Sequence, residues 1–249
     1  MADLSQMKLG RKAVKTDSRT LRLAKYMTPS LPPAPPARDW SNGITDWGMM
    51  LNDKLGCCTI AGIAHAVQVW SCNVSTEFTV PDSQVQQYYE EWDGYNPDDP
   101  STDQGGIELD VLNNWKKNCF DGHELLAFAD VDKTALDKIR QAINLFGGLY
   151  IGISLPITAQ DQDIWDVDPE GGPDSQSGSW GGHAVFVCAY DEETFTCITW
   201  GKLKKMTAAF WTEYVDEAHA LLSPDWIADK GAPSGFDLDD LQTDLSLIH

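Results

Sequence analysis

The sequence predicts an α+β fold in which a helical N-terminal lobe faces a lobe built from an antiparallel sheet. Apolar residues recur at helical spacing through much of 58–146, whereas short β-branched and aromatic runs dominate 149–201. Helices and strands are therefore grouped along the chain, which is typical of α+β proteins and not of alternating βαβ units. With 249 residues, the chain is long enough to form one large domain or two small lobes around a sizeable core.

The first 38 residues differ from the rest in charge and composition. They hold eight Lys or Arg against two Asp, a net charge of +6, so the remaining residues carry 10 basic and 36 acidic groups, a net charge of −26. Five prolines lie between Pro29 and Pro36, and such a run favours stiff, extended polyproline II. We therefore expect a basic, proline-rich arm over 1–38, a folded body over 39–230 and an acidic tail over 231–249.

The uneven distribution of charge indicates which partners the body and the arm can bind. The acidic body would repel nucleic acid phosphates, so we expect no nucleic acid binding by the body. The basic arm has two interpretations, contact with phosphate or docking on an acidic protein surface, its own or a neighbour's. The second is favoured because such a surface is tethered beside the arm.

The chain is expected to remain inside the cell that makes it, either in the cytoplasm or within a phage particle. No apolar run approaches the ~20 residues that span a bilayer, and the N-terminus lacks the apolar core of a secretory signal. The six cysteines are therefore expected to be thiols. No C-x-x-C pair occurs, and we expect neither a metal nor a cofactor.

Four helices are expected in the first part of the chain. The first begins near Cys58, just after Gly56, and buries small and apolar residues at helical spacing. A second helix follows with Asp82 as its N-cap. The remaining two are expected over 106–120 and 132–146, the last of them ending at Gly147 and Gly148.

The pattern then changes to strands. Runs of β-branched and aromatic residues over 149–156, 183–191 and 194–201 predict three strands, the last two joined by a tight turn. The basic stretch 201–206 is expected to be a solvated turn. Residues 206–222 are expected to return to helix.

A cysteine at the start of the first helix suggests nucleophilic chemistry. Unpaired N–H groups and the helix dipole favour a thiolate there, and either Cys57 or Cys58 could exploit this. A nucleophilic thiol also needs a base within hydrogen-bond reach. His183 is the best candidate base because it begins a buried strand after a glycine loop, whereas the other histidines lack neighbours typical of a site.

These residues resemble the papain-like cysteine peptidases over most of 39–201. Asp39-Trp40 resembles the dipeptide near the start of the family's mature body, and Cys58 follows Trp40 by the 18 residues that separate that Trp from the family's nucleophile. The histidine strand of the family resembles "HAVFVCAYD". The resemblance implies a two-lobe papain-like fold with Cys58 as nucleophile and His183 as base, and it leaves Cys57 as a small residue beside the site.

The same resemblance assigns further site residues. Asn52 stands where the family has its oxyanion-hole glutamine, and Gly105-Gly106 resembles the glycine pair that lines the substrate cleft. Trp200, followed by Gly201, resembles the family's Trp-Gly, which implies a place beside the site. Trp180 lies in the loop that borders the cleft in this family, where it could line a substrate pocket or anchor the loop.

The chain also departs from the family pattern. The asparagine that orients the catalytic histidine is replaced by Ile198 or Thr199, depending on whether the count starts from Trp200 or from His183. Isoleucine cannot accept a hydrogen bond, whereas a threonine hydroxyl can. Asn52 is shorter than glutamine by roughly one methylene, about 1.5 Å, which would weaken an oxyanion contact. With 38 residues before the body, the arm is too short to form the family's usual inhibitory propeptide.

Two functions remain open from the sequence. The first is a cysteine peptidase or related thiol amide hydrolase acting on a peptide or protein. The second is a weakly active or inactive papain-like fold that serves as a structural or assembly protein, for example in a phage virion, with the arm docked on neighbouring subunits.

Overall fold

The computed structural model describes residues 4–25, 33–227 and 232–234. The start of the proline-rich run and most of the acidic tail lie outside the described residues. Within the described residues, no helix is both long and apolar enough to cross a membrane.

Helix α1 forms the centre of the helical lobe. Every residue from Cys58 to Ser71 in this helix is buried, which explains its run of small and apolar side chains. Gly62 lets the helix approach the sheet, because a Cβ there would lie 2.7 Å from a ring carbon of Tyr150. The expected helices are present, with bounds α1 Cys58–Val74, α2 Asp82–Asp93, α3 Glu108–Lys117, α4 Leu136–Phe146 and, later in the chain, α5 Ala208–Tyr214.

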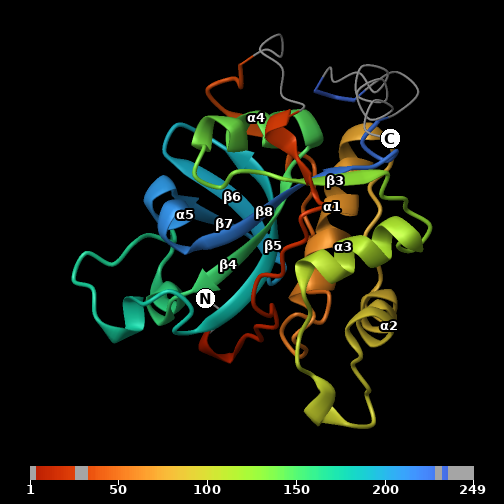
Figure 1. Cartoon of the computed structure of the whole chain (residues 1–249), viewed down its shortest axis with the longest axis horizontal. Helices are drawn as coiled ribbons and strands as arrows, with labels where there is room; N and C mark the ends of the chain where they lie inside the picture. The colour runs from red at the N-terminus through yellow and green to blue at the C-terminus, as the bar shows by residue number, and fades with distance from the viewer. Residues whose placement is uncertain (1–3, 26–32, 228–231, 235–249) are drawn as a thin grey trace.

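A mostly antiparallel sheet forms the second lobe. Its strand order is β1-β3-β8-β4-β5-β6-β7, with β2 paired to β5 and only the β1–β3 pair parallel. Helices α1, α2 and α3 gather on one side of this sheet (Figure 1). The strands are β1 Leu21–Arg22, β2 Arg38–Asp39, β3 Ala127–Asp130, β4 Leu149–Leu155, β5 Gly181–Tyr190, β6 Thr194–Thr199, β7 Lys202–Thr207 and β8 Val215–Leu222.

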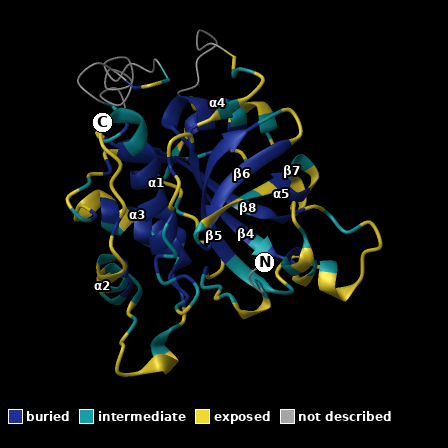
Figure 2. Cartoon of the chain, turned by 180° about the vertical axis from the view of Figure 1, so that it is seen from behind, coloured by how far each residue is buried: buried dark blue, intermediate teal, exposed yellow. Residues whose placement is uncertain are grey.

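The α+β prediction is confirmed, and the core lies between α1 and the central strands. Figure 2 shows α1 and the central strands β4, β5 and β6 mostly buried, whereas α2 and the peripheral loops carry many of the exposed residues. All six cysteines are free thiols. The helical lobe meets the sheet lobe where α1 packs on β5, so a cleft between the two lobes is expected at the start of α1.

The expected helix over 206–222 is wrong in its second half. Only α5 is helical, and the chain then continues as strand β8 between β3 and β4. Both edges of β8 are hydrogen-bonded to neighbouring strands, and all its residues except Asp216 are buried. Tertiary pairing therefore overrides the helical spacing of the apolar residues, as it often does for short segments.

Two smaller expectations are also corrected. The basic stretch expected to be a solvated turn forms β7, which pairs antiparallel with β6. Most of this strand is exposed or only partly buried. Its run of lysines therefore resembles a solvated turn in the sequence. Helix α2 includes Asp82, and its N-cap position is Pro81 with an extended ψ of 148°.

The arm docks on the chain's own body wherever it is described. Its backbone contacts Gly106 before α3 and Gly182 in β5, so it connects the two lobes. In Figure 1 the arm, in red and orange, runs along the boundary between the sheet and helices α1 and α3. Leu21 and Arg22 then add the short strand β1 to the sheet edge.

Candidate active site

Cys58 is the first residue of α1 and is completely buried. The preceding turn passes through Met50 and Leu51 at positive φ, 51° and 59°, before the helix begins. Cys57 is also buried, and its Sγ–H donates to the Met50 carbonyl at 3.4 Å. Cys57 is therefore engaged with its own turn, and Cys58 is the thiol that begins the helix.

His183 lies on β5, where it pairs with Ile153 of β4. A hydrogen bond of 2.7 Å joins its Nε2 to Thr199 Oγ1 on the strand β6. Its Nδ1 is buried and has no hydrogen-bond partner among the described residues. The imidazole is therefore held on one nitrogen and left unpartnered on the other.

The structure brings the start of α1 and the histidine strand together. The backbone N–H groups of Ala184, directly after His183, and of Gly10 in the arm interact with the Cys58 sulfur and favour its thiolate. Trp200 stacks on His183 with ring centroids 4.5 Å apart and an interplanar angle of 12°. The arm and the strand β5 thus both approach the sulfur at the start of α1.

Burial keeps both Cys58 and His183 neutral. Loss of solvent raises the pKa of Cys58 to about 11, more than the nearby N–H groups lower it. Loss of solvent also lowers the pKa of His183 to about 3, and the positive charge of Arg11 adds to this shift. At neutral pH Cys58 is therefore a neutral thiol and His183 a neutral imidazole.

Gly105 and Gly106 contact the arm directly. Gly106 N donates to the Gly10 carbonyl at 2.8 Å, and Lys12 N donates to the Gly106 carbonyl at 2.8 Å. Gly105 has a φ of 74°, and a Cβ there would lie 1.7 Å from the Gly10 oxygen. Although the arm is shorter than a typical inhibitory propeptide, it covers the glycine pair and Cys58.

Asn52 lies in the turn before α1, and Trp180 lies beside Trp200. Asn52 is buried in the turn before α1, and its Oδ1 has no hydrogen-bond partner in the described part of the chain. Trp180 packs against Trp200 at a centroid distance of 5.5 Å. Thr199 and Trp200 also line a cavity of about 460 Å³ with Met7 of the arm.

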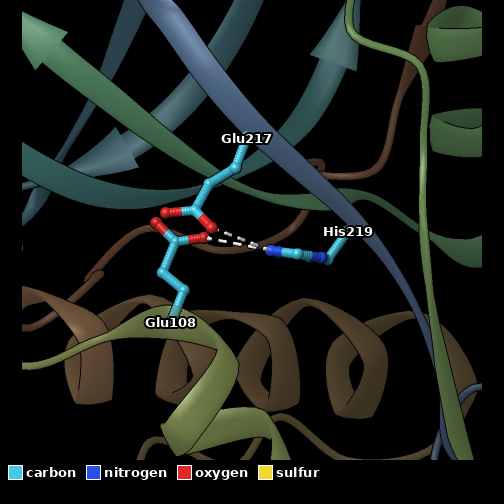
Figure 3. Close-up of side chains that lie close together, drawn as sticks. All are labelled: Glu108, Glu217 and His219. Carbon is cyan, nitrogen blue, oxygen red and sulfur yellow. Dashed lines mark hydrogen bonds and ion pairs between the residues drawn. The ribbon is translucent and has the colours of Figure 1, made fainter. Parts of the chain in front are cut away.

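A buried charged cluster beside Cys58 was missed in the sequence. Glu108 from α3 points towards Glu217 and His219 from β8 (Figure 3). His219 Nε2 lies 3.3 Å from Glu217 Oε2 and 3.7 Å from Glu108 Oε2. The possible ligand atoms of these three residues lie within 4.8 Å of one another, so the set can also hold a metal ion.

Arg11 of the arm completes this cluster. Its guanidinium lies 2.5 Å from Asp216 Oδ2 and 2.8 Å from Glu217 Oε1. The sequence did not reveal the cluster because 206–222 was expected to be helical. The signal that could have found it is the alternation of Glu217 and His219, which puts both side chains on one face of a strand.

Comparisons with known proteins identify the fold. No family model and no curated protein matches the sequence. Among solved structures, xylellain, a cysteine protease from Xylella fastidiosa, is 14% identical with a TM-score of 0.63, covering 87% of this chain and 96% of its own. Procathepsin B S9 from Trypanosoma congolense is 9% identical with a TM-score of 0.57, covering 89% and 88%. Procathepsin L2 from the Tenebrio molitor midgut is 13% identical with a TM-score of 0.55, covering 88% and 79%.

Proposed function

We propose that this chain, which has the papain-like cysteine peptidase fold, is a cysteine peptidase or related thiol amide hydrolase. One observation carries the proposal: the Cys58 sulfur at the start of α1 is approached by the N–H of Ala184, and the preceding residue, His183, leaves Nδ1 unpartnered. A helix start and an oriented imidazole are the two elements that activate a thiol.

In the proposed reaction, His183 Nδ1 takes the proton of the Cys58 thiol and the sulfur attacks the amide carbon. The oxyanion would be held by the Cys58 backbone N–H, which has no acceptor within the helix, and by the Asn52 side-chain amide. The imidazolium then gives its proton to the leaving amine as the C–N bond breaks. Water, deprotonated by the same imidazole, attacks the thioester and releases the acid and the free thiol.

Thr199 would act as the positioning residue for His183. Its hydroxyl meets Nε2 at 2.7 Å, where the resembling family has an asparagine. A hydroxyl offers one donor and can accept as well, so it can fix the ring in either tautomer. The sequence count that started from His183 identified this threonine.

The proposed reaction requires the arm to leave the site. Gly10 lies against Cys58, and Arg11 N donates to the Gly182 carbonyl at 3.0 Å, so substrate cannot reach the sulfur while residues 10–12 are docked. Solvent that enters after release would lower the pKa of Cys58 and raise that of His183, because desolvation is the main cause of both shifts.

Labelling with a thiol-directed peptidyl epoxide tests the proposal. We expect mass spectrometry to find the adduct on Cys58 in molecules whose arm has been released, and labelling to be lost in Cys58→Ala and reduced by at least about tenfold in His183→Ala. Cys57→Ala is the matched control and should still be labelled. Labelling of Cys57 in its place, or equal labelling after His183→Ala, would refute the assigned roles.

The alternative function is a papain-like fold retained for structure or assembly, for instance in a virion. The observation that favours it is the docked arm, which fills the site and leaves a neutral thiol and imidazole. In that case the arm would leave its own body and bind the same surface of a neighbouring subunit. Light scattering of the full chain would then give a mass above one subunit, and the epoxide would not label Cys58 under any condition.

A further inference from the structure

Arg11 is a fully charged side chain bound in a closed pocket beside the candidate nucleophile. Its side chain is only 2% exposed. Its guanidinium donates to Asp216, Glu217 and, at 3.3 Å, to Ser154 Oγ. Burying an unpaired guanidinium would be costly, so these partners are what permit the arm to place an arginine here.

The pocket is built into the sheet by a glycine and a bulge. Gly152 of β4 pairs with Glu217 of β8, and a Cβ there would lie 2.8 Å from Glu108 Oε1 and 2.9 Å from Arg11 Cδ. The register then shifts, because Ile153 pairs with Val215 and Asp216 is the extra residue. A bulge of this kind redirects a side chain, and here it lets two successive carboxylates reach one guanidinium.

Glu108 adds a third carboxyl to the pocket, beside the two that contact Arg11. It is completely buried, and neither carboxylate oxygen has a hydrogen-bond partner among the described residues. Burial first, and then the charge of Glu217, raise the pKa of Glu108 well above its usual value. Its Oε2 lies 3.7 Å from His219 Nε2, so Glu108 faces the same pocket as the carboxylates that hold Arg11.

The position of the pocket relative to Cys58 is fixed by the arm backbone. Gly10 approaches the sulfur, and the next residue, Arg11, places its side chain in the pocket. Arg11 pairs in parallel with Gly106 on one side and donates to Gly182 on the other. The arm is therefore bound as an extended peptide, with backbone hydrogen bonds to both lobes.

We propose that the acidic pocket formed by Glu108, Asp216, Glu217 and His219 around Gly152 binds the arginine side chain of an extended peptide, and that Arg11 occupies this place when the arm is docked. Arginine fits better than lysine because its planar fork meets two carboxylates at once. If the proposed hydrolase function is correct, peptides with arginine in this position are its substrate class.

A divalent cation is the competing occupant and is less well supported. Both carboxylate oxygens of Glu217 are already engaged, Oε1 by the Arg11 guanidinium at 2.8 Å and Oε2 by His219 Nε2 at 3.3 Å. Asp216 Oδ2 also contacts the guanidinium, so the arrangement fits a planar cation held between two carboxylates.

The test uses alkylation of Cys58 in the full chain, followed residue by residue by mass spectrometry. The exposed Cys119 serves as the internal reference for reagent reactivity. In Arg11→Ala the anchor is lost, so we expect Cys58 to react at least about tenfold faster than in wild type. Lys12→Ala removes the same charge from the exposed neighbouring position and should change the rate by less than twofold.

The second step adds synthetic peptides to the Arg11→Ala protein. We expect the arm sequence 7–15 to protect Cys58 at concentrations at least about tenfold lower than the same peptide with leucine in place of arginine. Adding Glu217→Gln should remove most of this preference. Equal protection by the two peptides would overturn the proposal, as would protection by Mn²⁺ alone with no effect of the arginine peptide.

Two further outcomes keep the test decisive. Should Arg11→Ala fail to fold, Arg11→Lys carries the same peptide comparison, because it keeps the charge and loses the fork. Protection does not require turnover. A protein that binds the arginine peptide and hydrolyses no peptide would retain the pocket and lose the proposed hydrolase function.

Discussion

At the scale of single residues, the position of His183 depends on one hydroxyl group. Thr199 Oγ1 contacts Nε2 at 2.7 Å, and Trp200 stacks on the ring face. The stack restrains the plane of the imidazole but not its rotation within that plane. The hydroxyl is therefore the contact that determines which nitrogen points away from β6.

Thr199→Val tests this positioning role. The substitution keeps the shape and leaves Nε2 without its partner, so we expect a loss of about 1–3 kcal/mol in the free energy of unfolding. Labelling of Cys58 by the epoxide should fall on the order of tenfold, with a changed pH profile. Thr199→Ser, which restores the hydroxyl, should recover both. Stability loss without any change in the pH profile would indicate a purely structural threonine.

At the scale of elements, the site depends on strands that the sequence showed only in part. Helices α1 to α4 and strands β4 to β6 follow from apolar spacing, β-branched runs and the glycines that end them. Strand β8 does not, because its alanines and leucines fit a helix equally well. Its pairing with β3 and β4 decides its conformation, and this pairing is what delivers Glu217 and His219.

Gly152→Ala tests the pocket at the level of β4. The added methyl group would meet Glu108 and the Arg11 side chain, so we expect the arm to be displaced and Cys58 alkylation to rise several-fold. Unlike Arg11→Ala, this variant should gain no protection from the arginine peptide. Ile153→Val is the matched control, since it changes the neighbouring position without narrowing the pocket. Undiminished peptide protection in Gly152→Ala would contradict the placement of the pocket.

At the scale of the whole molecule, a basic arm lies against an acidic body. The composition alone favoured docking of the arm on an acidic surface, and the described arm residues dock on the chain's own body. Most of the arm's charges remain exposed and contribute little, as surface ion pairs usually do. The buried Arg11 is different, because its partners are shielded from solvent and salt.

The stability of the fold should depend on pH through His219. Its pKa is raised to about 9 in the folded protein, against about 6.5 when unfolded, so its stabilising contribution is complete below pH 6.5 and is lost as pH rises towards 9. The groups that face it are Asp130, Glu108, Glu217 and Tyr150.

We expect the free energy of unfolding to decrease by about 1–3 kcal/mol between pH 6.5 and 9. Denaturant titrations across this range measure the decrease. His219→Gln should flatten the curve over the same interval, and an unchanged slope in this variant would assign the pH dependence to other groups.

The sequence by itself determined the α+β class and the helix that starts at Cys58, and through its family resemblance it offered His183 as candidate base with either Ile198 or Thr199 beside it. These follow from local spacing, from glycines at element ends and from the order of a few motif residues. Only the tertiary structure decided that the arm lies over the thiol and that Arg11 is held by two carboxylates from β8. The physical reason is that strand pairing and buried charge contacts join residues about two hundred positions apart, and no local pattern encodes them.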